Sequence, residues 1–283
     1  MSREFFPGAL LTLSSGPHTL VALDIDGTIM GHDGSIASAV KDAIHGLIAD
    51  GTHIVLATGR SIPAVTPVIE ALDLPPGWAV CSNGAVTIQY ESANEYEIED
   101  VVTFDPGPTL RKLRENAPDA VFAVEEVGVG FKLSQPFPMG ELSGEHEIVS
   151  FEELCNTNAS RVTVREVGKT ADHFHELVKR TGLHEVSYAV GWTAWLDISP
   201  DGVSKASALE TIRQRLRVDD RDTLAAGDGN NDIEMLRWAE YGVAMGDANE
   251  QTRAAADYVT ASVEDEGLVP VLRSIRSSAY ELT

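Results

Sequence analysis

The chain has 283 residues, 43% of them hydrophobic, and its 21 basic and 44 acidic side chains give a formal net charge of −23. That length exceeds one ordinary domain and suits two, and the apolar fraction suffices for a sizeable core. So negative a surface repels nucleic acids and anionic membranes, which argues against a polynucleotide substrate and a membrane partner. The two cysteines, Cys81 and Cys155, predict no disulfide framework and are typical of a reducing compartment.

Residues 1–19 predict an N-terminal extension that packs against the core or frays. Its apolar patch at Ala9–Leu13 is too short to span a membrane and lacks the charge order of a signal peptide. We therefore expect a cytoplasmic protein. Both a monomer and a homodimer are compatible with the sequence.

Residues 20–84 alternate short apolar runs with amphipathic segments, which is typical of βαβ units. This order predicts a parallel sheet with right-handed crossovers, whose ligands bind at the carboxyl ends of the strands. The expected strands are 20–25, 53–57 and 78–81, and the expected helices are 35–50 and 62–72.

From Ala85 onward strands follow at shorter spacing, which predicts an α+β domain inserted over residues 85–197. The first domain is then discontinuous, formed by residues 20–84 and 198–283. In the insertion we expect strands at 86–90, 96–104, 120–125, 128–133, 161–166, 186–190 and 193–198, helices at 109–116 and 171–180, and loops over 134–160. In the returning segment we expect strands at 223–226 and 242–244 and helices at 204–216, 231–239, 249–256 and 267–277.

The first predicted strand ends in two carboxylates, Asp24 and Asp26, followed at once by Gly27 and Thr28. An ionised carboxylate out of water is costly unless a cation or hydrogen bonds compensate its charge. Side chains at positions i and i+2 leave a strand on the same side, so the two acids can flank one point in space. The alternative interpretation is a strand that runs into an Asp-Gly turn.

The second predicted strand ends in Thr58-Gly59-Arg60. Thr58 can donate a hydrogen bond to a phosphate oxygen, and Gly59 lets backbone N–H groups approach closely. Ser61 is a candidate cap for the following helix, whose N-terminal end favours an anion. A capped helix without any ligand is the alternative.

Three charged residues in the second half of the chain extend this pattern. Lys205 stands at the start of a predicted helix, where its charge opposes the helix dipole but can neutralise a phosphate or an attacking carboxylate. Asp228 follows another predicted strand and is a candidate ligand for Mg²⁺, which prefers oxygen donors. Asp232 is a further ligand or an acceptor that orients the ligands. The alternative interpretation involves no ligand: Lys205 is then a solvated surface residue, and Asp232 interacts favourably with the dipole of its helix.

Taken together, the motifs resemble those of the haloacid dehalogenase (HAD) superfamily of phosphatases, in particular its Cof-type branch with a large C2-type cap. Within that branch, the chain resembles sugar-phosphatase, sucrose-phosphatase-like and phosphoglycolate-phosphatase-like hydrolases. The resemblance implies an α/β fold in which a Rossmann-like parallel-sheet core carries the inserted α+β segment as a cap domain. The matching motifs are Asp24–Thr28, Thr58–Arg60, Ser82–Ala85, Gly202–Lys205, Gly227–Asp232, Tyr241–Asn249 and Ala256–Thr260.

The resemblance also implies an activity, namely Mg²⁺-dependent hydrolysis of a small phosphorylated metabolite such as a sugar or polyol phosphate. Asp24 is then the nucleophile that forms an aspartyl-phosphate, and Asp26 is the general acid and base. The implied ligands of Mg²⁺ are Asp24, Asp26 (through its backbone carbonyl), Asp228 and Asp232. The residues implied in phosphate or substrate binding are Thr58, Gly59, Arg60, Asn83, Lys205 and Asn231.

Two other functions remain compatible with these motifs. A phosphomutase or phosphotransferase shares the aspartyl-phosphate step and differs in the group that accepts the phosphoryl. A non-catalytic phosphate-binding module has no need of Asp26, which argues against it. For Asn83, an Asn-Gly turn is the alternative to substrate binding.

Overall fold

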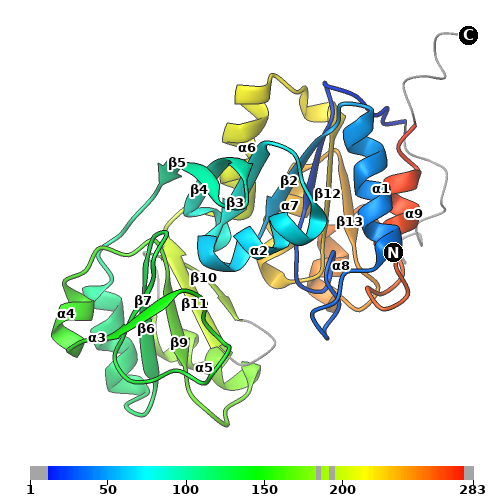
Figure 1. Cartoon of the computed structure of the whole chain (residues 1–283). Coiled ribbons are helices and arrows are strands. Elements are labelled where there is room, and N and C mark those ends of the chain that lie inside the picture. The colour runs from blue at the N-terminus through cyan, green and yellow to red at the C-terminus, as the bar shows by residue number, and fades with distance from the viewer. Residues whose placement is uncertain (1–11, 183–185, 191–194, 277–283) are drawn as a thin grey trace, which may run out of the picture.

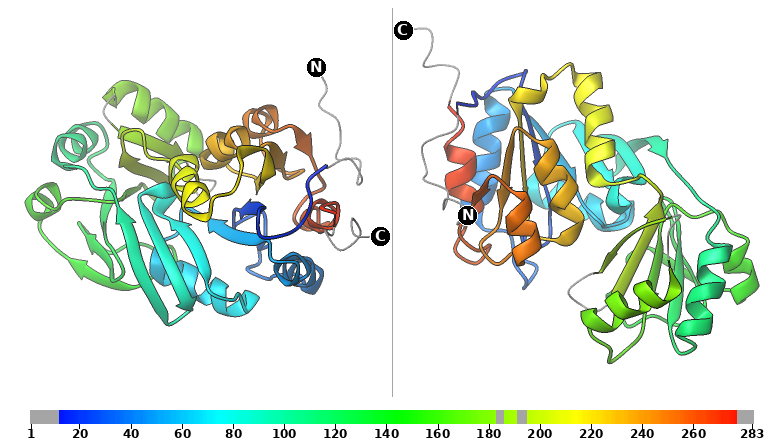
Figure 2. Two further views of the ribbon diagram at one scale, coloured as in Figure 1. Left: turned by 90° about the horizontal axis from the view of Figure 1, so that it is seen from above. Right: turned by 180° about the vertical axis from the view of Figure 1, so that it is seen from behind.

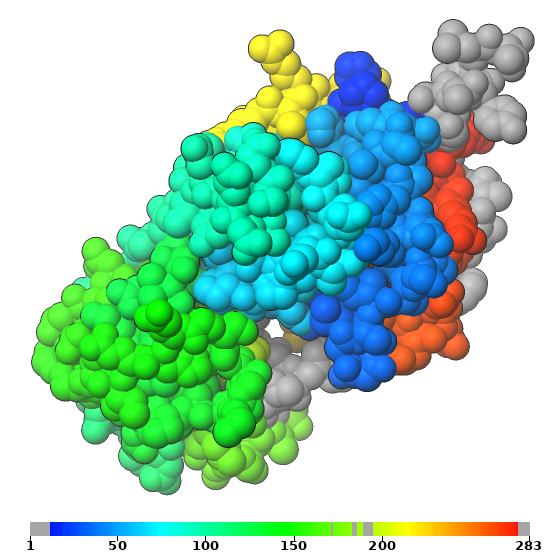
Figure 3. All heavy atoms as spheres, viewed as in Figure 1, coloured from blue at the N-terminus to red at the C-terminus, as the bar shows by residue number. Residues whose placement is uncertain are grey.

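The computed structural model describes residues 12–182, 186–190 and 195–276. These residues form two lobes, each built on one β-sheet (Figures 1 and 3). The larger lobe, called the core, has an eight-stranded sheet in the order β14-β13-β12-β1-β2-β3-β4-β5. The smaller lobe, called the inserted domain, has a six-stranded sheet in the order β10-β11-β9-β6-β7-β8.

The core sheet is parallel from β14 to β3, and β4 and β5 extend it in antiparallel fashion. This confirms the predicted Rossmann-like order, with β1 in the middle of the parallel part. The strands are β1 (Leu20–Leu23), β2 (His53–Ala57), β3 (Gly77–Cys81), β4 (Val86–Ser92), β5 (Glu95–Val101), β12 (Thr223–Gly227), β13 (Tyr241–Ala244) and β14 (Tyr258–Val259).

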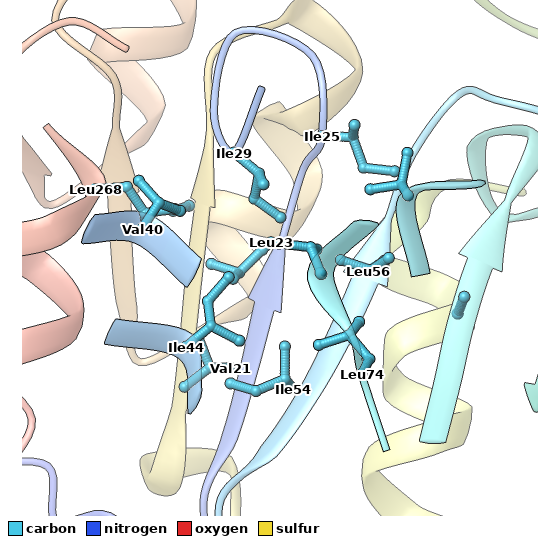
Figure 4. Close-up of a cluster of buried hydrophobic side chains, with 14 of the residues drawn as sticks. Val21, Leu23, Ile25, Ile29, Val40, Ile44, Ile54, Leu56, Leu74 and Leu268 are labelled. Carbon is cyan, nitrogen blue, oxygen red and sulfur yellow. The ribbon is translucent and has the colours of Figure 1, made fainter. Parts of the chain in front are cut away.

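Helices cover both faces of the core sheet (Figure 2), so its central strands β1 and β12 are buried along their whole length and are mostly apolar. On one face, Val21 and Leu23 of β1 pack with α1 and α9 (Figure 4) and with α2, whereas Leu20 and Ala22 pack with α6 and α7 on the other. The core helices are α1 (Ser38–Ala49), α2 (Ile62–Leu72), α6 (Lys205–Leu216), α7 (Ile233–Trp238), α8 (Glu250–Ala255) and α9 (Leu268–Arg273), with 3₁₀ turns η1 (Ser82–Gly84), η2 (Asp220–Asp222) and η3 (Asn230–Asp232).

The inserted domain carries its helices on one face of its sheet. Phe122, Val124 and Val162 point to that face and pack with α3 and α5, while the alternating residues Glu125 and Arg161 point towards the core. The elements are β6 (Val121–Glu126), β7 (Gly130–Leu133), β8 (Glu145–Ile148), β9 (Val162–Arg165), β10 (Val186–Val190), β11 (Trp195–Pro200), α3 (Gly107–Asn116), α4 (Phe151–Cys155) and α5 (Ala171–Thr181).

Two predictions about the insertion need correction. Strands β4 and β5 were expected in the inserted domain, but β4 pairs with β3 and β5 pairs with β4, so both belong to the core sheet. Hairpin spacing in a sequence identifies antiparallel strands but does not say which sheet they join; here the turn at Ser82–Gly84 folds β4 back along β3. The region 134–160, expected to be loops, contains β8 and α4. All four residues of β8 are exposed, so no apolar pattern marked it.

Of the predicted N-terminal extension, residues 12–19 are described and residues 1–11 lie outside the described residues. Leu13 is buried, and Ser14 forms a β-bridge with Arg276, so this part packs against the end of the chain. Parts of two other predicted elements, residues 193–194 and residue 277, also lie outside the described residues. Among the helices that are described, none has the length and apolarity needed to cross a membrane.

Gly84 offers a test of the close packing between η1 and α6. It has a positive φ of 101°, and a Cβ there would collide with the backbone carbonyl of Ser204. We expect Gly84→Ala to lower the free energy of unfolding by about 3 kcal/mol, as measured by urea denaturation. Gly34→Ala is the matched control, because Gly34 has a φ of 81° with nothing within 4 Å, and should lose about 1 kcal/mol. Equal losses would contradict the packing argument.

Candidate active site

The predicted site residues lie where four neighbouring strands end. Asp24 follows β1, Thr58 follows β2, Asn83 follows β3 and Asp228 follows β12. Since the sheet order is β12-β1-β2-β3, these four loops adjoin one another at the carboxyl edge of the parallel sheet. This is the edge at which open α/β sheets bind their ligands.

A buried lysine ties this edge together. The Nζ of Lys205 donates hydrogen bonds to Asp24 Oδ1 and Asp232 Oδ1, each at 2.6 Å. The Lys205 side chain is 0% exposed, so its position at the start of α6 does not place it in solvent. Ser204 supplies the helix cap by accepting from the backbone N–H of Ser207, which frees Lys205 to point into the site.

Asp232 binds the loop after β12 with its second oxygen. Its Oδ2 accepts the backbone N–H groups of Asp228 at 2.9 Å and Gly229 at 2.8 Å. A side chain at Gly227 would overlap the Asp232 carboxylate, so a glycine is required there. Asp232 therefore links Lys205 to the loop that carries Asp228.

Three buried carboxylates meet beside the lysine. One oxygen each from Asp24, Asp228 and Asp232 lies within 4.8 Å of the others. Carboxylate oxygens are the donors that Mg²⁺ prefers, so the residues present fit such an ion. The site is also close-packed: a side chain at Gly27, whose φ is +77°, would overlap the Asp228 carboxylate. The carboxylate of Asp26 is not part of this group.

The pKa values of the acids reflect this crowding. Burial, then the charge of Asp232, raises the pKa of Asp24 to about 7 in spite of Lys205. Burial, then the charges of Asp24 and Asp232, raises the pKa of Asp228 to about 9. Burial disfavours the charged ammonium of Lys205, but Asp232 and Asp24 outweigh it and raise its pKa. The single ammonium of Lys205 thus does not balance the negative charge of three carboxylates. A cation bound among these carboxylates would supply the missing positive charge.

Asp26 is paired with Arg60 at the rim of the site. The guanidinium donates to both carboxylate oxygens, with Nε to Oδ2 at 2.8 Å and Nη2 to Oδ1 at 2.5 Å. This hydrogen bond raises the pKa of Arg60 against the opposing effect of burial. The Asp26 side chain is 60% exposed, so it remains accessible to a ligand from solvent.

The remaining predicted residues surround Thr58. Thr58 is buried, and its Oγ1 accepts the backbone N–H of Arg60 at 3.1 Å. Asn83 has a left-handed φ of 56°, and its Oδ1 accepts from Asn231 Nδ2 at 2.9 Å. A Cβ at Gly59 would lie 3.0 Å from Asn83 Oδ1, so these loops are in close contact. All the residues singled out in the sequence therefore lie around one edge.

Two residues that contact this edge, Glu125 and Arg161, carried no motif. Ser82 donates to both oxygens of Glu125, and Arg161 donates to the carbonyl of Gly59. Glu125 and Arg161 come from the inserted domain and are almost completely buried. The only sequence signal is a charged residue at the margin of an apolar strand, which is too common to identify a site.

The crowded acids predict an unusual pH dependence of stability when no divalent cation is present. The folded state keeps a proton on Asp228 that the unfolded state loses above pH 3.8, so the stability that this proton contributes is lost as the pH rises towards about 9. In EDTA, we expect the free energy of unfolding to fall between pH 5 and pH 8 in the wild type. This decrease should exceed that of Asp228→Asn by at least about 1.4 kcal/mol. Urea unfolding at both pH values measures this. An equal decrease in the free energy of unfolding of the two proteins would show that the pKa of Asp228 is not raised in the folded state.

Comparison with known proteins agrees with this geometry. The family model of haloacid dehalogenase-like hydrolases matches residues 21–272. A phosphoglycolate phosphatase of Natronomonas pharaonis is 30% identical over 260 residues, covering 91% of this chain and 98% of that protein. The 5-amino-6-(5-phospho-D-ribitylamino)uracil phosphatase YcsE of Bacillus subtilis is 25% identical over 254 residues, covering 90% of this chain and 94% of that protein.

The fold agrees as well. The HAD subclass IIB sugar phosphatase BT4131 has a similar structure, with a TM-score of 0.75, 24% identity and coverage of 90% of this chain and 98% of that one. Because the family model spans most of the chain, from the first strand of the core to α9, the family is established. The chain belongs to the haloacid dehalogenase-like hydrolases and is a phosphatase of that type.

Proposed function

We propose that the protein is a Mg²⁺-dependent phosphomonoester hydrolase for a small metabolite that carries one phosphate on a sugar or polyol. The observation that supports this most directly is the bridge of Lys205 between Asp24 and Asp232 beside Asp228. A buried ammonium among three carboxylates suits a site in which a carboxylate must approach an anionic phosphate. A structural ion pair needs only one partner acid.

In this proposal Asp24 is the nucleophile. Its carboxylate oxygen forms a bond to phosphorus while the bond between phosphorus and the alcohol oxygen breaks, which leaves an aspartyl-phosphate. Water then attacks phosphorus, the bond to Asp24 breaks, and inorganic phosphate leaves. Lys205 orients the Asp24 carboxylate and offsets negative charge during both steps.

Asp26 is the proposed proton carrier. After it takes up a proton, it donates this proton to the departing alcohol and later accepts one from the attacking water. To do so its carboxylate must leave Arg60, to which both oxygens are bound. We propose that the incoming phosphate, itself an anion, takes over the Arg60 guanidinium and thereby releases Asp26.

The proposed phosphate contacts come from Thr58, Gly59 and Lys205, and the proposed substrate contacts from Asn83 and Asn231. Thr58 Oγ1 already accepts a backbone hydrogen bond, which leaves its own hydroxyl hydrogen for a phosphate oxygen. The residues that would hold Mg²⁺ are Asp24, Asp228, Asp232 and the backbone carbonyl of Asp26. Bound there, Mg²⁺ would supply positive charge that offsets the repulsion between carboxylate and phosphate.

The charges around the site favour a neutral leaving group. Among the described residues that line it, Lys205, Arg60 and Arg161 are each already paired with a carboxylate. A second anionic group on the substrate, such as the carboxylate of phosphoglycolate, would compete with those carboxylates. Hydroxyl groups of a sugar or polyol need no cation, so these substrates suit the site better.

Loss of the nucleophile is the first test. We expect Asp24→Asn to lower kcat by at least about 10³-fold, because the amide cannot attack phosphorus, while the volume is unchanged. The fold should be retained, since the substitution also removes a buried charge. Release of inorganic phosphate measures kcat, and circular dichroism checks the fold. Asp33→Asn, at an exposed residue of a nearby loop, is the control. Turnover of Asp24→Asn at the wild-type rate would refute the assignment.

The substrate class is tested by comparing phosphate esters with and without Mg²⁺. We expect kcat/KM for sugar or polyol phosphates to exceed that for phosphoglycolate by at least about tenfold, which corresponds to about 1.4 kcal/mol. EDTA should abolish turnover. The product is informative as well, since free phosphate indicates hydrolysis and an isomeric sugar phosphate indicates a mutase. A preference for phosphoglycolate would contradict the proposal that the site favours a neutral leaving group.

A further inference from the structure

Arg161 belongs to the inserted domain and contacts the core. Its side chain is also held by contacts within the inserted domain. Its Nε lies 3.1 Å from Glu125 Oε2, and its guanidinium stacks on the ring of Phe131 at 5.3 Å from the ring centre. Asp197 Oδ1 lies 3.9 Å away on another side and accepts from Thr163 at 2.7 Å. Because these partners surround the guanidinium, its direction is determined within the inserted domain.

The side chains of this pair are almost fully buried, with 5% exposure for Arg161 and 1% for Glu125. Buried charged groups must satisfy their remaining hydrogen-bonding capacity. The core meets this need at two places: Arg161 Nη1 donates to the carbonyl of Gly59, and Ser82 Oγ donates to both Glu125 oxygens at 2.7–2.8 Å. The pair therefore contacts the two core loops that follow β2 and β3.

The bond to Gly59 bears on Thr58 through one peptide unit. The carbonyl that Arg161 binds and the backbone N–H of Arg60 belong to the same planar peptide, so they point in opposite directions and rotate together. That N–H donates to Thr58 Oγ1 at 3.1 Å. An arginine from the inserted domain thus orients the hydrogen bond that leaves the Thr58 hydroxyl hydrogen free for a ligand.

We infer that Arg161 is a positioning residue, which aligns Thr58 for phosphate through the peptide between Gly59 and Arg60. This inference rests on the proposed function, because it assumes that Thr58 binds the transferred phosphate. Its consequence is that the phosphate pocket is complete only when the inserted domain lies against the core. Thr58 is then aligned for phosphate whenever the inserted domain lies against the core, and substrate binds to this arrangement.

A double-mutant cycle separates this role from simple support of the fold. We expect Arg161→Met and Thr58→Ala each to lower kcat/KM by about tenfold or more. The kcat/KM of the double variant should lie within about threefold of that of the less active single variant. Non-additivity follows because Arg161 has no effect on catalysis once the Thr58 hydroxyl is gone. Multiplied losses would show independent roles and overturn the inference.

A second measurement does not depend on catalysis. Hydrogen exchange of the Arg60 amide reports the peptide directly, and we expect it to accelerate at least about tenfold in Arg161→Met. Arg111→Met is the matched control, because Arg111 pairs with Glu152 at 2.8 Å inside the inserted domain. An unchanged Arg60 amide would overturn the inference.

Two further outcomes are decided by the same measurements. If Arg161→Met fails to fold, Ser82→Ala takes its place: it leaves the inserted domain intact, weakens the contact with Glu125 and should also accelerate exchange at Arg60; no change there would refute the coupling. If the wild type turns over no phosphate ester, the proposed function fails, whereas exchange at Arg60 still tests whether Arg161 holds the peptide.

Discussion

The contact of Lys205 with Asp24 and Asp232 is the interaction on which the rest of the site depends. It joins residues that are 181 positions apart in the chain, and all three side chains are buried. An unpaired ammonium or carboxylate at this depth would be strongly unfavourable, so neither half of the core can be completed alone. The inserted domain must return the chain at one fixed point, where α6 begins with Lys205.

The same contact explains why the surrounding loops are so tightly packed. Asp232 can hold both Lys205 and the loop of Asp228 only if the backbone passes directly beside its carboxylate, which excludes a side chain at Gly227. Gly84 lies against the carbonyl of Ser204, the residue that caps α6. Glycine is therefore needed at Gly227 because the Asp232 carboxylate requires the space, and at Gly84 because the backbone at Ser204 does; the positive φ of Gly84 adds to that need.

The sequence was sufficient to predict the parallel core and the cluster of acids, because both follow from local patterns. Apolar runs that end in Asp24, Thr58 and Asp228 identify strands, and strand order in βαβ units brings their ends together. Lys205 was identified by its conflict with the helix dipole, which a buried pairing with acids resolves. The placement of β4 and β5 could not be predicted, since antiparallel spacing does not specify a sheet. Glu125 and Arg161 depend on contacts between two domains, which no local pattern records.

Charge also shapes how such a protein can accept an anionic substrate. The chain carries a net charge of −23, so its surface repels phosphate esters at long range. Apart from the Arg161–Glu125 pair of the inserted domain, the site contains four carboxylates, those of Asp24, Asp26, Asp228 and Asp232, against the two cations Lys205 and Arg60. An anion that enters must therefore displace a carboxylate from a cation or arrive with additional positive charge. The pairing of Arg60 with the exposed Asp26 is the one that a phosphate can exchange, because the buried bonds of Lys205 also hold the loops in place. In the mechanism that we propose, the residue that gives up its partner to the substrate is therefore the same acid that then moves a proton.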